Sequence, residues 1–523
     1  MIRHSKKISS ESWKNLNWKK FRKDLFRLQC RVFKAIKAGN KRKALSLQKL
    51  ILKSKAARFL AIRQVTQLNS GKKTAGIDGV KSLNFKERFE LEELLKENSN
   101  NWKHQGLRSI PIPKKDGSTR NLKIPTIKDR AWQCLVKYAI EPAHEAQFHA
   151  NSYGFRPGRS AHDAQHALFM NLSSIANGIT KRILSIDIEK CFDRINHSAI
   201  MERVIAPKGI KEGIFRCLKA GTNPGYPDQG TPQGGVISPL LANIALNGIE
   251  EVHSYNTRYN KKGIPNGVHV TPTVRYADDM VVILRPEDNE TRVFNRISRF
   301  LRERGLMASK KKTKLHASTE GFDYLGWHFK VLKDGRFKAY PSDENLKKFK
   351  KKVKSIVNCS NYGSKLKAKK LAPIVRGWRN YHKHCDMSAS KHSLWFLHYR
   401  TWKVFNKEKR NSKESTTKLI NIAFPKVSYS EHRFVKVRGN KSPYDNDINY
   451  WSKRNSKLYD NATAKALRKQ NHTCGHCGLK FTDDEKVHLH HIDSNHNNWK
   501  TNNLMAVHES CHDYIHMSNR VIP

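Results

Sequence analysis

Two stretches of the chain, RILSIDIEKCFDRI (182–195) and RYADDMVVIL (275–284), decide the expected fold. Each contains a run of aliphatic residues that is typical of a buried strand, and each carries aspartate in or next to that run. Carboxylates are seldom buried without a partner, so these acids indicate a cation site. We expect Asp187, Asp278 and Asp279 to converge from two strands and to hold two Mg²⁺ ions about 3.5–4 Å apart, an arrangement that serves nucleotidyl transfer. The alternative, that each acid is an ordinary surface or capping residue, would suit a lone aspartate better.

The whole chain is strongly basic. Its 523 residues include 100 Lys and Arg against 45 Asp and Glu, a net charge of +55. Such a charge repels itself unless it meets a polyanion, so we expect a nucleic acid partner. Hydrophobic residues make up 38% of the chain, which excludes wholesale disorder, and no segment approaches the roughly 18 apolar residues of a membrane span. Nine cysteines, six of them scattered singly, indicate a reducing compartment rather than a disulfide framework.

Composition and periodicity divide the chain into five segments. Apolar spacing predicts basic amphipathic helices over 12–68, and GYPDQGTPQGG (225–235) is a loop that enters an apolar helix. Residues 341–470 hold 32 basic and nine acidic residues, whereas 471–523 hold four basic and six acidic ones. We therefore expect boundaries that give the segments 1–105, 106–340, 341–410, 411–470 and 471–523.

Seven blocks in order resemble the reverse transcriptases that group II introns encode. They are LRSIPIPKKDGSTRNLKIPTIKDRAWQCLVKYAIEPAHE (107–145), SYGFRPGRSAHDA (152–164), ILSIDIEKCFDRINH (183–197), GTPQGGVISPLLANIALNGIE (230–250), RYADDMVVI (275–283), GLMASKKKTKLH (305–316) and FDYLGWHF (322–329). The resemblance implies an α+β right-hand polymerase. Residues 1–105 would be an N-terminal extension and the start of the fingers, 106–340 fingers and palm, 341–410 the thumb or maturase region, and 411–470 a DNA-binding or linker region.

The same resemblance implies roles for single residues around the three aspartates. Phe192 would lie beneath the incoming sugar and exclude a ribose 2′-hydroxyl, and Gln233 would touch the incoming nucleotide and the template. Lys114 and Arg120 would clamp the dNTP triphosphate by charge and fork geometry. Lys312 would lie near the same phosphates, with Lys310, Lys311 and Lys314 as competing choices, and a solvated basic face is the alternative for any of these lysines.

Two further groups have competing interpretations. In SYGFRPGRSAHDA we expect Arg156 and Arg159 to contact template, and Tyr153 and Phe155 to be core. Aromatic residues of the thumb-like region could stack on bases, but their helical spacing favours packing between helices. These residues are Trp378, Tyr381, Trp395 and Trp402.

The C-terminal segment combines two metal-binding patterns. Cys474 and Cys477 form CxxC, and His508 and Cys511 form HxxC, which together suit a structural Zn²⁺. The segment also resembles the HNH nuclease motif, a ββα-metal fold found as the last domain of many group II intron proteins. That resemblance makes His491 the general base and Asn503 the residue that orients it, with a catalytic divalent ion on His490, His512 and His516. The alternative is a purely structural zinc module.

The expected function combines these parts. The protein would bind its group II intron RNA, the lariat, as a ribonucleoprotein and promote splicing. It would then nick target DNA with the HNH domain and copy the intron by target-primed synthesis (retrohoming). A free-standing reverse transcriptase, or a splicing cofactor without mobility, are the alternatives. We expect no membrane partner and a bacterial, nucleoid-associated cytoplasmic location, with an organelle as the other choice.

Overall fold

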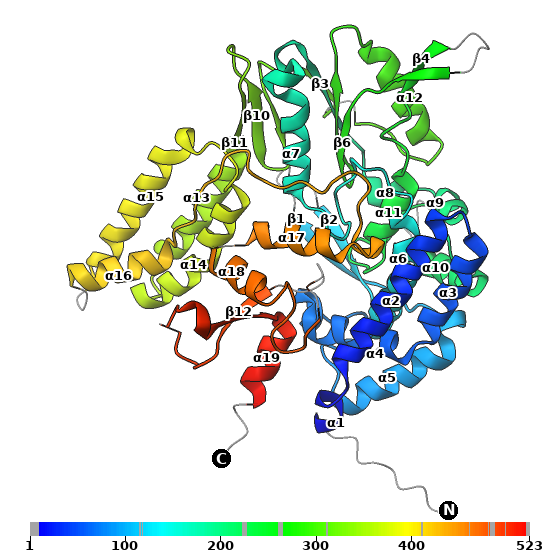
Figure 1. Cartoon of the computed structure of the whole chain (residues 1–523), viewed down its shortest axis with the longest axis horizontal. Coiled ribbons are helices and arrows are strands. Elements are labelled where there is room, and N and C mark those ends of the chain that lie inside the picture. The colour runs from blue at the N-terminus through cyan, green and yellow to red at the C-terminus, as the bar shows by residue number, and fades with distance from the viewer. Residues whose placement is uncertain are drawn as a thin grey trace, which may run out of the picture.

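The computed structural model describes residues 10–113, 117, 119–221, 227–259, 265–309, 312–408, 412–459, 461–479, 481, 487–496 and 498–518. Figure 1 shows a helical N-terminal region in blue, strands with covering helices in cyan and green, a helical group in yellow and a C-terminal unit in orange and red. Among the described residues, no helix is long and apolar enough to cross a membrane.

The N-terminal region is built from helices, as expected over 12–68. Its helices are α1 (Ser10–Lys14), α2 (Trp18–Lys37), α3 (Lys41–Lys53), α4 (Lys55–Arg63) and α5 (Phe85–Asn98). The side chains of Asn17, Asn40 and Ser54 cap α2, α3 and α4 by accepting a backbone N–H three residues later. The apolar faces pack on α6 (Ile127–Glu145), which is buried over most of its length. The hairpin of β1 (Arg108–Pro113) and β2 (Thr119–Ile124) precedes α6.

Four antiparallel strands form the palm sheet, in the order β6-β7-β3-β8. The strands are β3 (Arg182–Asp187), β6 (Thr273–Tyr276), β7 (Asp279–Leu284) and β8 (Lys314–Ala317). Successive side chains of a strand point to opposite faces. Leu184 and Ile186 accordingly pack in one core with α6, α11 (Ser238–Leu246) and α12 (Glu290–Arg302). Ile183 and Ile283 pack in the other core, and the sheet is buried on both faces.

The second core joins the palm sheet to a helix and a smaller sheet. The helix is α7 (Ala161–Leu172), and the sheet has the antiparallel order β11-β10-β9. Its strands are β9 (Phe322–Tyr324), β10 (Trp327–Val331) and β11 (Phe337–Pro341). Tyr381 enters this core and stacks on Trp327 with ring centroids 4.4 Å apart, so it is packed as expected, but on a strand of the small sheet instead of between thumb helices.

The thumb region forms a helical core of its own. Its helices are α13 (Asp343–Val357), α14 (Ser364–Tyr381), α15 (Ser388–Asn406) and α16 (Lys413–Ala423). Phe349, Leu371, Phe405 and Ile420 share the core, and Trp378 and Trp402 pack against it as expected. The core includes α16 and therefore continues past residue 410, where we expected the thumb to end. Trp395 was expected to pack between helices, but 59% of its surface is exposed.

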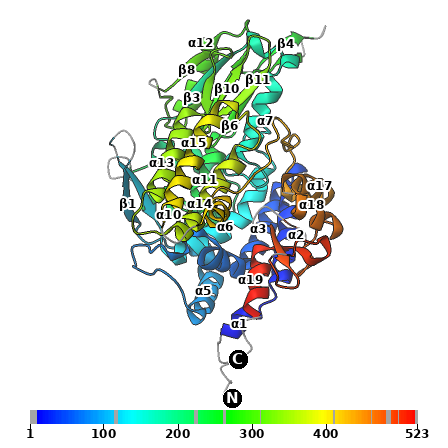
Figure 2. The same ribbon diagram turned by 90° about the vertical axis from the view of Figure 1, so that its left-hand side faces the viewer.

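Residues 425–447, which we call the strap, run from the thumb across α7 and α6. His432 stacks on Phe169 of α7 with centroids 4.5 Å apart, and Tyr444 donates a hydrogen bond of 2.9 Å to Glu141 of α6. The strap leads into α17 (Ile448–Leu458), α18 (Asn461–Lys469), the antiparallel pair β12 (Val487–His491) and β13 (Leu504–His508), and α19 (Glu509–Ser518). Figures 1 and 2 both place this C-terminal unit beside the N-terminal helices, where Arg22 of α2 donates a 2.7 Å hydrogen bond to Ser510.

Candidate active site and metal centres

Three carboxylates lie at the adjoining ends of the two central strands of the palm sheet. Asp187 ends β3 and pairs in register with Asp279, which begins β7, while Asp278 lies in the turn before it. Burial and the neighbouring acids raise the pKa of Asp279 to about 6, and burial raises the pKa of Asp278. Three oxygen donors whose negative charges oppose one another form a donor set that suits hard divalent cations such as Mg²⁺. Lys312 supplies a local positive charge, with its Nζ 3.1 Å from Asp187 Oδ2.

The turn that carries Asp278 is held by a buried ion pair that the sequence did not disclose. Ala277 has φ +59°, a left-handed backbone conformation that non-glycine residues seldom adopt. Arg275 donates 2.9 Å to the Ala277 carbonyl and 2.6 Å to Glu250, and the side chains of Arg275 and Glu250 are fully buried. Tyr324 donates 3.2 Å to the Asp279 carbonyl from β9. Arg275 and Glu250 each stand in an apolar block of the sequence, which indicates that each charge needs a buried partner. The sequence does not reveal which partner each one has.

Arg120, Gln233 and Asp193 form a chain of hydrogen bonds beside the carboxylates. Arg120 Nε of β2 donates to Gln233 Oε1, and Gln233 Nε2 donates 3.2 Å to Asp193 of α8 (Cys191–Arg194). The Thr231 amide donates 2.7 Å to the Phe192 carbonyl, which ties the same loop to the expected sugar-contacting aromatic. Two of the predicted nucleotide-binding residues are thus brought together. Lys114, Lys310 and Lys311 lie outside the described residues.

The predicted template contacts of Arg156 and Arg159 are wrong, because both guanidinium groups are used inside the protein. Arg156 pairs with Glu145 through bonds of 2.8 and 2.9 Å, and both side chains are 1% exposed. Arg159 is 9% exposed and donates to the carbonyls of Ala150 (2.6 Å) and Gly439 (2.8 Å), the latter in the strap.

The two aromatic residues of this loop differ from each other. Tyr153 is fully buried, as expected. Phe155 was expected in the core but is 50% exposed, and its ring lies edge-on to Phe192 with centroids 6.5 Å apart. Phe155 therefore belongs to the surroundings of the carboxylates instead of the core.

The C-terminal unit contains two groups of potential metal ligands. In each group the ligand atoms lie within 4.8 Å of one another; the groups are Cys474, Cys477, His508 and Cys511, and His490, His512 and His516. Zinc ligands placed tetrahedrally at 2.0–2.3 Å are about 3.3–3.8 Å apart. Cys477 Sγ and Cys511 Sγ lie 3.3 and 3.9 Å from His508 Nδ1, so the first group fits Zn²⁺.

The histidine group lies on the face of β12 that meets α19. The ring centroids of His512 and His516 are 5.6 and 5.3 Å from that of His490, and His512 Nε2 lies 3.2 Å from His516 Nε2. Burial and the adjacent imidazoles lower the pKa of His512 to about 4, which keeps it in the neutral, ligand form at pH 7. A cluster of neutral imidazoles fits a divalent transition metal.

His491 faces the other way, because neighbouring residues of a strand alternate. Its ring lies beside His496 and Trp499, and its buried Nε2 has no hydrogen-bond partner among the described residues. Asn503 was expected to orient the His491 ring. Its side-chain amide instead donates 2.8 Å to Asp493 and 2.9 Å to the Asn498 carbonyl. Asn503 thus shapes the loop that follows His491.

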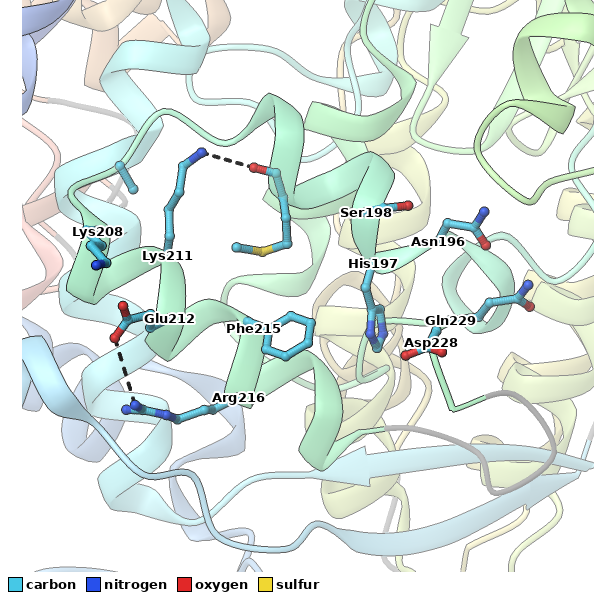
Figure 3. Close-up of a pocket in the computed structure, with 12 residues that line it drawn as sticks. Asn196, His197, Ser198, Lys208, Lys211, Glu212, Phe215, Arg216, Asp228 and Gln229 are labelled. Atoms are coloured by element: carbon cyan, nitrogen blue, oxygen red, sulfur yellow. Dashed lines mark hydrogen bonds and ion pairs between the residues drawn. The ribbon is translucent and has the colours of Figure 1, made fainter.

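A cavity of about 1030 Å³ lies between α9 (His197–Arg203) and α10 (Lys208–Ala220). Figure 3 shows its lining, with Phe215 and His197 at its centre and an ion pair between Arg216 and Glu212 at its edge. None of the predicted site residues lines this cavity.

Comparisons with known proteins agree with the palm geometry. Reverse transcriptase (RNA-dependent DNA polymerase) matches residues 112–329, the N-terminal domain of reverse transcriptase matches 13–95, and the group II intron, maturase-specific domain matches 346–420.

Three individual proteins illustrate the range of the similarity. Maturase-like protein 1 of Euglena gracilis is 39% identical over 480 residues, which cover 90% of this chain and 97% of the relative. Group II intron-encoded protein LtrA of Lactococcus lactis subsp. cremoris is 34% identical over 155 residues, 28% of this chain and 25% of the relative. A solved structure of telomerase from Candida albicans, in complex with a fragment of telomeric RNA, has 14% identity and a TM-score of 0.31 with 62% of each chain covered. The near-complete match to the Euglena protein and the three matching domains show that the chain belongs to the group II intron reverse transcriptase and maturase family.

Proposed function

We propose that the protein is an RNA-directed DNA polymerase that binds its group II intron RNA, promotes splicing, and copies the intron into nicked target DNA. The observation that carries the polymerase part is the placement of Asp187, Asp278 and Asp279 at the adjoining ends of β3 and β7, near Arg120 and its partner Gln233. The maturase-specific domain over 346–420 favours an intron RNA partner over a free-standing reverse transcriptase.

Each residue of the palm site has a task in nucleotide addition. The three aspartates would hold two Mg²⁺ ions, which when bound assist deprotonation of the primer 3′-hydroxyl and neutralise the leaving pyrophosphate. Arg120 places positive charge near Asp278 and Lys312 contacts Asp187, and these two cations would bind the triphosphate. Phe192, half-buried and tied to the Gln233 loop, would pack under the sugar and exclude a 2′-hydroxyl.

The separation of polymerase and splicing roles has a direct test. Asp278→Ala combined with Asp279→Ala should abolish dNTP incorporation on an RNA template, because the cation ligands are lost. Intron RNA binding and splicing in vitro should remain at the wild-type level, because the thumb does not contribute to the carboxylate site. Loss of splicing in a variant that stays folded and binds RNA would disprove separable roles. Wild-type protein that splices without any DNA synthesis would instead favour a splicing cofactor without mobility.

We further propose that residues 471–523 are an HNH nuclease that nicks target DNA. The segment lies beyond the residues matched by the three domains, so the proposal depends on the side chains. Its support is the order β12, β13, α19 with a four-ligand Cys and His group, a three-imidazole group, and His491 on the opposite strand face. His491 would take a proton from water, while His490, His512 and His516 would hold the divalent ion and Zn²⁺ would be structural.

The nuclease has its own test. His491→Ala should remove nicking of target DNA and leave primer extension and zinc content unchanged, whereas His328→Ala on β10 is the matched control. Retained nicking by His491→Ala would refute the proposed base. A metal analysis that finds no zinc in the purified protein would refute the structural zinc site.

The cytoplasmic, bacterial location remains a prediction, since relatives occur both in Euglena and in bacteria.

A further inference from the structure

The cavity between α9 and α10 contains an aromatic ring that the protein core does not use. Phe215 lines the cavity and is 41% exposed. Helix α10 is already anchored in the core through Ile210, Ile214 and Leu218, so Phe215 is not a displaced core residue. The cavity volume of about 1030 Å³ is sufficient for a ligand of the size of a nucleotide.

One wall of the cavity carries two buried acceptor atoms without partners. His197 is buried, and its Nε2–H donates 2.8 Å to the Gly230 carbonyl. Burial lowers the pKa of His197, so the ring is neutral at pH 7 and its Nδ1 is an acceptor. This Nδ1 and the Oε1 of Gln229 are buried and have no hydrogen-bond partner among the described residues. Unpaired buried acceptors are costly, which indicates that a ligand with N–H donors completes this wall.

The opposite end of the cavity is positively charged. Lys208 and Lys211 lie in the first turn of α10, where no side chain caps the backbone N–H groups. Lys208 is exposed, and Lys211 donates 3.1 Å to a backbone carbonyl, which leaves its charge unbalanced. The other charged groups of the wall are paired: Arg216 with Glu212, and Asp228 with Lys219. Two lysines at the positive end of a helix suit a phosphate group.

These features follow one another across the cavity. Figure 3 shows Lys208 and Lys211 on the left, the ring of Phe215 in the middle, and His197 and Gln229 on the right. A matching ligand has an anion at one end, N–H donors at the other and a flat ring between them. A purine nucleoside monophosphate has this form, because its phosphate carries close to two negative charges and its base is flat and bears N–H groups.

The acids of the cavity favour a free nucleotide over one that belongs to a nucleic acid strand. Glu212 and Asp228 are exposed carboxylates of the cavity wall. A strand that passed through the cavity would bring successive phosphates near these like charges, which costs free energy. A single phosphate needs only the two lysines.

We infer that the cavity between α9 and α10 is a binding site for a free purine nucleoside monophosphate. Its phosphate contacts Lys208 and Lys211, and its base packs on Phe215 with N–H groups directed at His197 and Gln229. The site is separate from the palm carboxylates, so the inference does not depend on the proposed polymerase function.

The test measures binding of AMP and GMP to the full-length protein in EDTA by equilibrium dialysis. At least one of them should bind saturably, and Phe215→Ala should weaken that binding roughly fivefold or more, since a base stacked on an aromatic ring contributes substantially to affinity. Phe396→Ala, which removes a 50% exposed ring on α15, is the matched control and should bind as the wild type does. Protein with Asp278→Ala and Asp279→Ala should also bind normally, because the palm carboxylates do not line the cavity. Absence of saturable binding of both nucleotides up to roughly 1 mM, the weak end of typical metabolite sites, would overturn the inference.

A second comparison identifies which end of the ligand is recognised and where the ligand comes from. Lys208→Ala should weaken binding of the monophosphate and leave binding of the nucleoside unchanged, whereas Lys465→Ala on α18 should change neither. An RNA decamer of the same base should compete less well than the free monophosphate. Stronger competition by the decamer would overturn the inference in favour of a strand, and so would equal affinity of Phe215→Ala and the wild type for the monophosphate.

Discussion

Phe155 is held in an uncommon backbone conformation beside the proposed nucleotide site. Its φ of +56° is left-handed, and its ring meets Phe192 at 86° with centroids 6.5 Å apart. Strained residues persist where their neighbours hold them in place. Here the residue that follows Phe155, Arg156, is held by its ion pair with Glu145. The ring is exposed, so packing in the core does not account for its orientation.

We predict that Phe155→Ala weakens the choice of deoxynucleotides. Without the edge contact, the Phe192 ring gains freedom, and an aromatic pair of this kind is worth roughly two- to tenfold in an equilibrium. The ratio of kcat/KM for dCTP over CTP should fall by roughly that factor, and Phe192→Ala should lower it further. If the dCTP over CTP ratio is unchanged in Phe155→Ala but lost in Phe192→Ala, Phe155 does not position the Phe192 ring.

Asp279 connects the carboxylate site to stability. Its pKa is raised from 3.8 to about 6, first by desolvation and then by Asp278 and Asp187. A raised carboxyl pKa destabilises the fold at pH values above 6, and the penalty disappears as the pH falls below 4, where both folded and unfolded chains are protonated. A displacement of this size corresponds to about 3 kcal/mol, and because part of the Asp279 side chain still faces solvent, we expect a destabilisation of about 1 kcal/mol.

The pH dependence gives the second prediction. In EDTA at pH 7.5, Asp279→Asn should raise the unfolding midpoint of the palm by about 1–3 °C, and the difference should vanish near pH 4. Added Mg²⁺ should raise the midpoint of the wild type more than that of the variant. Differential scanning calorimetry across this pH range measures both effects. A variant that is less stable than the wild type at pH 7.5 without metal would contradict the view that the charged Asp279 destabilises the fold.

At the scale of elements, the loop of residues 152–159 supports the turn that carries Asp278. Ser152 forms a β-bridge to Arg275, and the Tyr153 amide donates 2.9 Å to the Arg275 carbonyl. Asn243 of α11 donates 2.8 Å to the Gly154 carbonyl. Gly154 lies so close to the turn that a Cβ there would overlap the backbone of Ala277. The glycine is required by close approach of two backbones, not by its own dihedral angles.

We predict that Gly154→Ala lowers DNA synthesis at least tenfold while the chain stays folded, because the turn bearing Asp278 must move. A displacement of about 1 Å at a reacting group is sufficient for losses of this order. Gly377→Ala in α14 is the matched control, since a Cβ there meets nothing within 4 Å. Steady-state primer extension and circular dichroism provide the two readouts. Normal synthesis by Gly154→Ala would show that the turn tolerates the shift.

Elements with a clear period could be predicted from the sequence, and their surroundings could not. The apolar runs of 182–188 and 279–284 became the central strands, and the amphipathic helices of 12–68 are present. Helical spacing also favoured packing between helices for Trp395, which is 59% exposed, because spacing does not say whether another element covers a helix face. The burial of Arg156 likewise depends on Glu145, which lies in a different block of the chain. Local pattern defines the element, and only the assembled fold defines its partner.

At the scale of the whole molecule, the strap connects the thumb to the C-terminal unit and packs against α7 on the way. Asp163 of α7 is its fixed point, with a side chain that is fully buried. Its Oδ1 accepts 2.7 Å from the Val437 amide and 3.0 Å from Arg454 of α17. One carboxylate thus joins the palm, the strap and the first helix of the C-terminal unit.

We predict that Arg454→Ala loosens the strap and the C-terminal unit while the palm keeps its activity. Arg454 is 4% exposed, and its removal leaves the Asp163 charge buried with fewer partners, which costs about 3 kcal/mol. Limited proteolysis should cut the strap at least tenfold faster, and the unfolding transition of the C-terminal unit should move to lower temperature. Lys465→Ala, an exposed cation on α18, is the matched control and should behave as the wild type. Because the carboxylates at β3 and β7 do not contact the strap, primer extension on poly(rA) should persist in Arg454→Ala. Equal cleavage rates in the two variants would mean that Asp163 is not the anchor, and loss of primer extension would mean that the strap supports the palm itself.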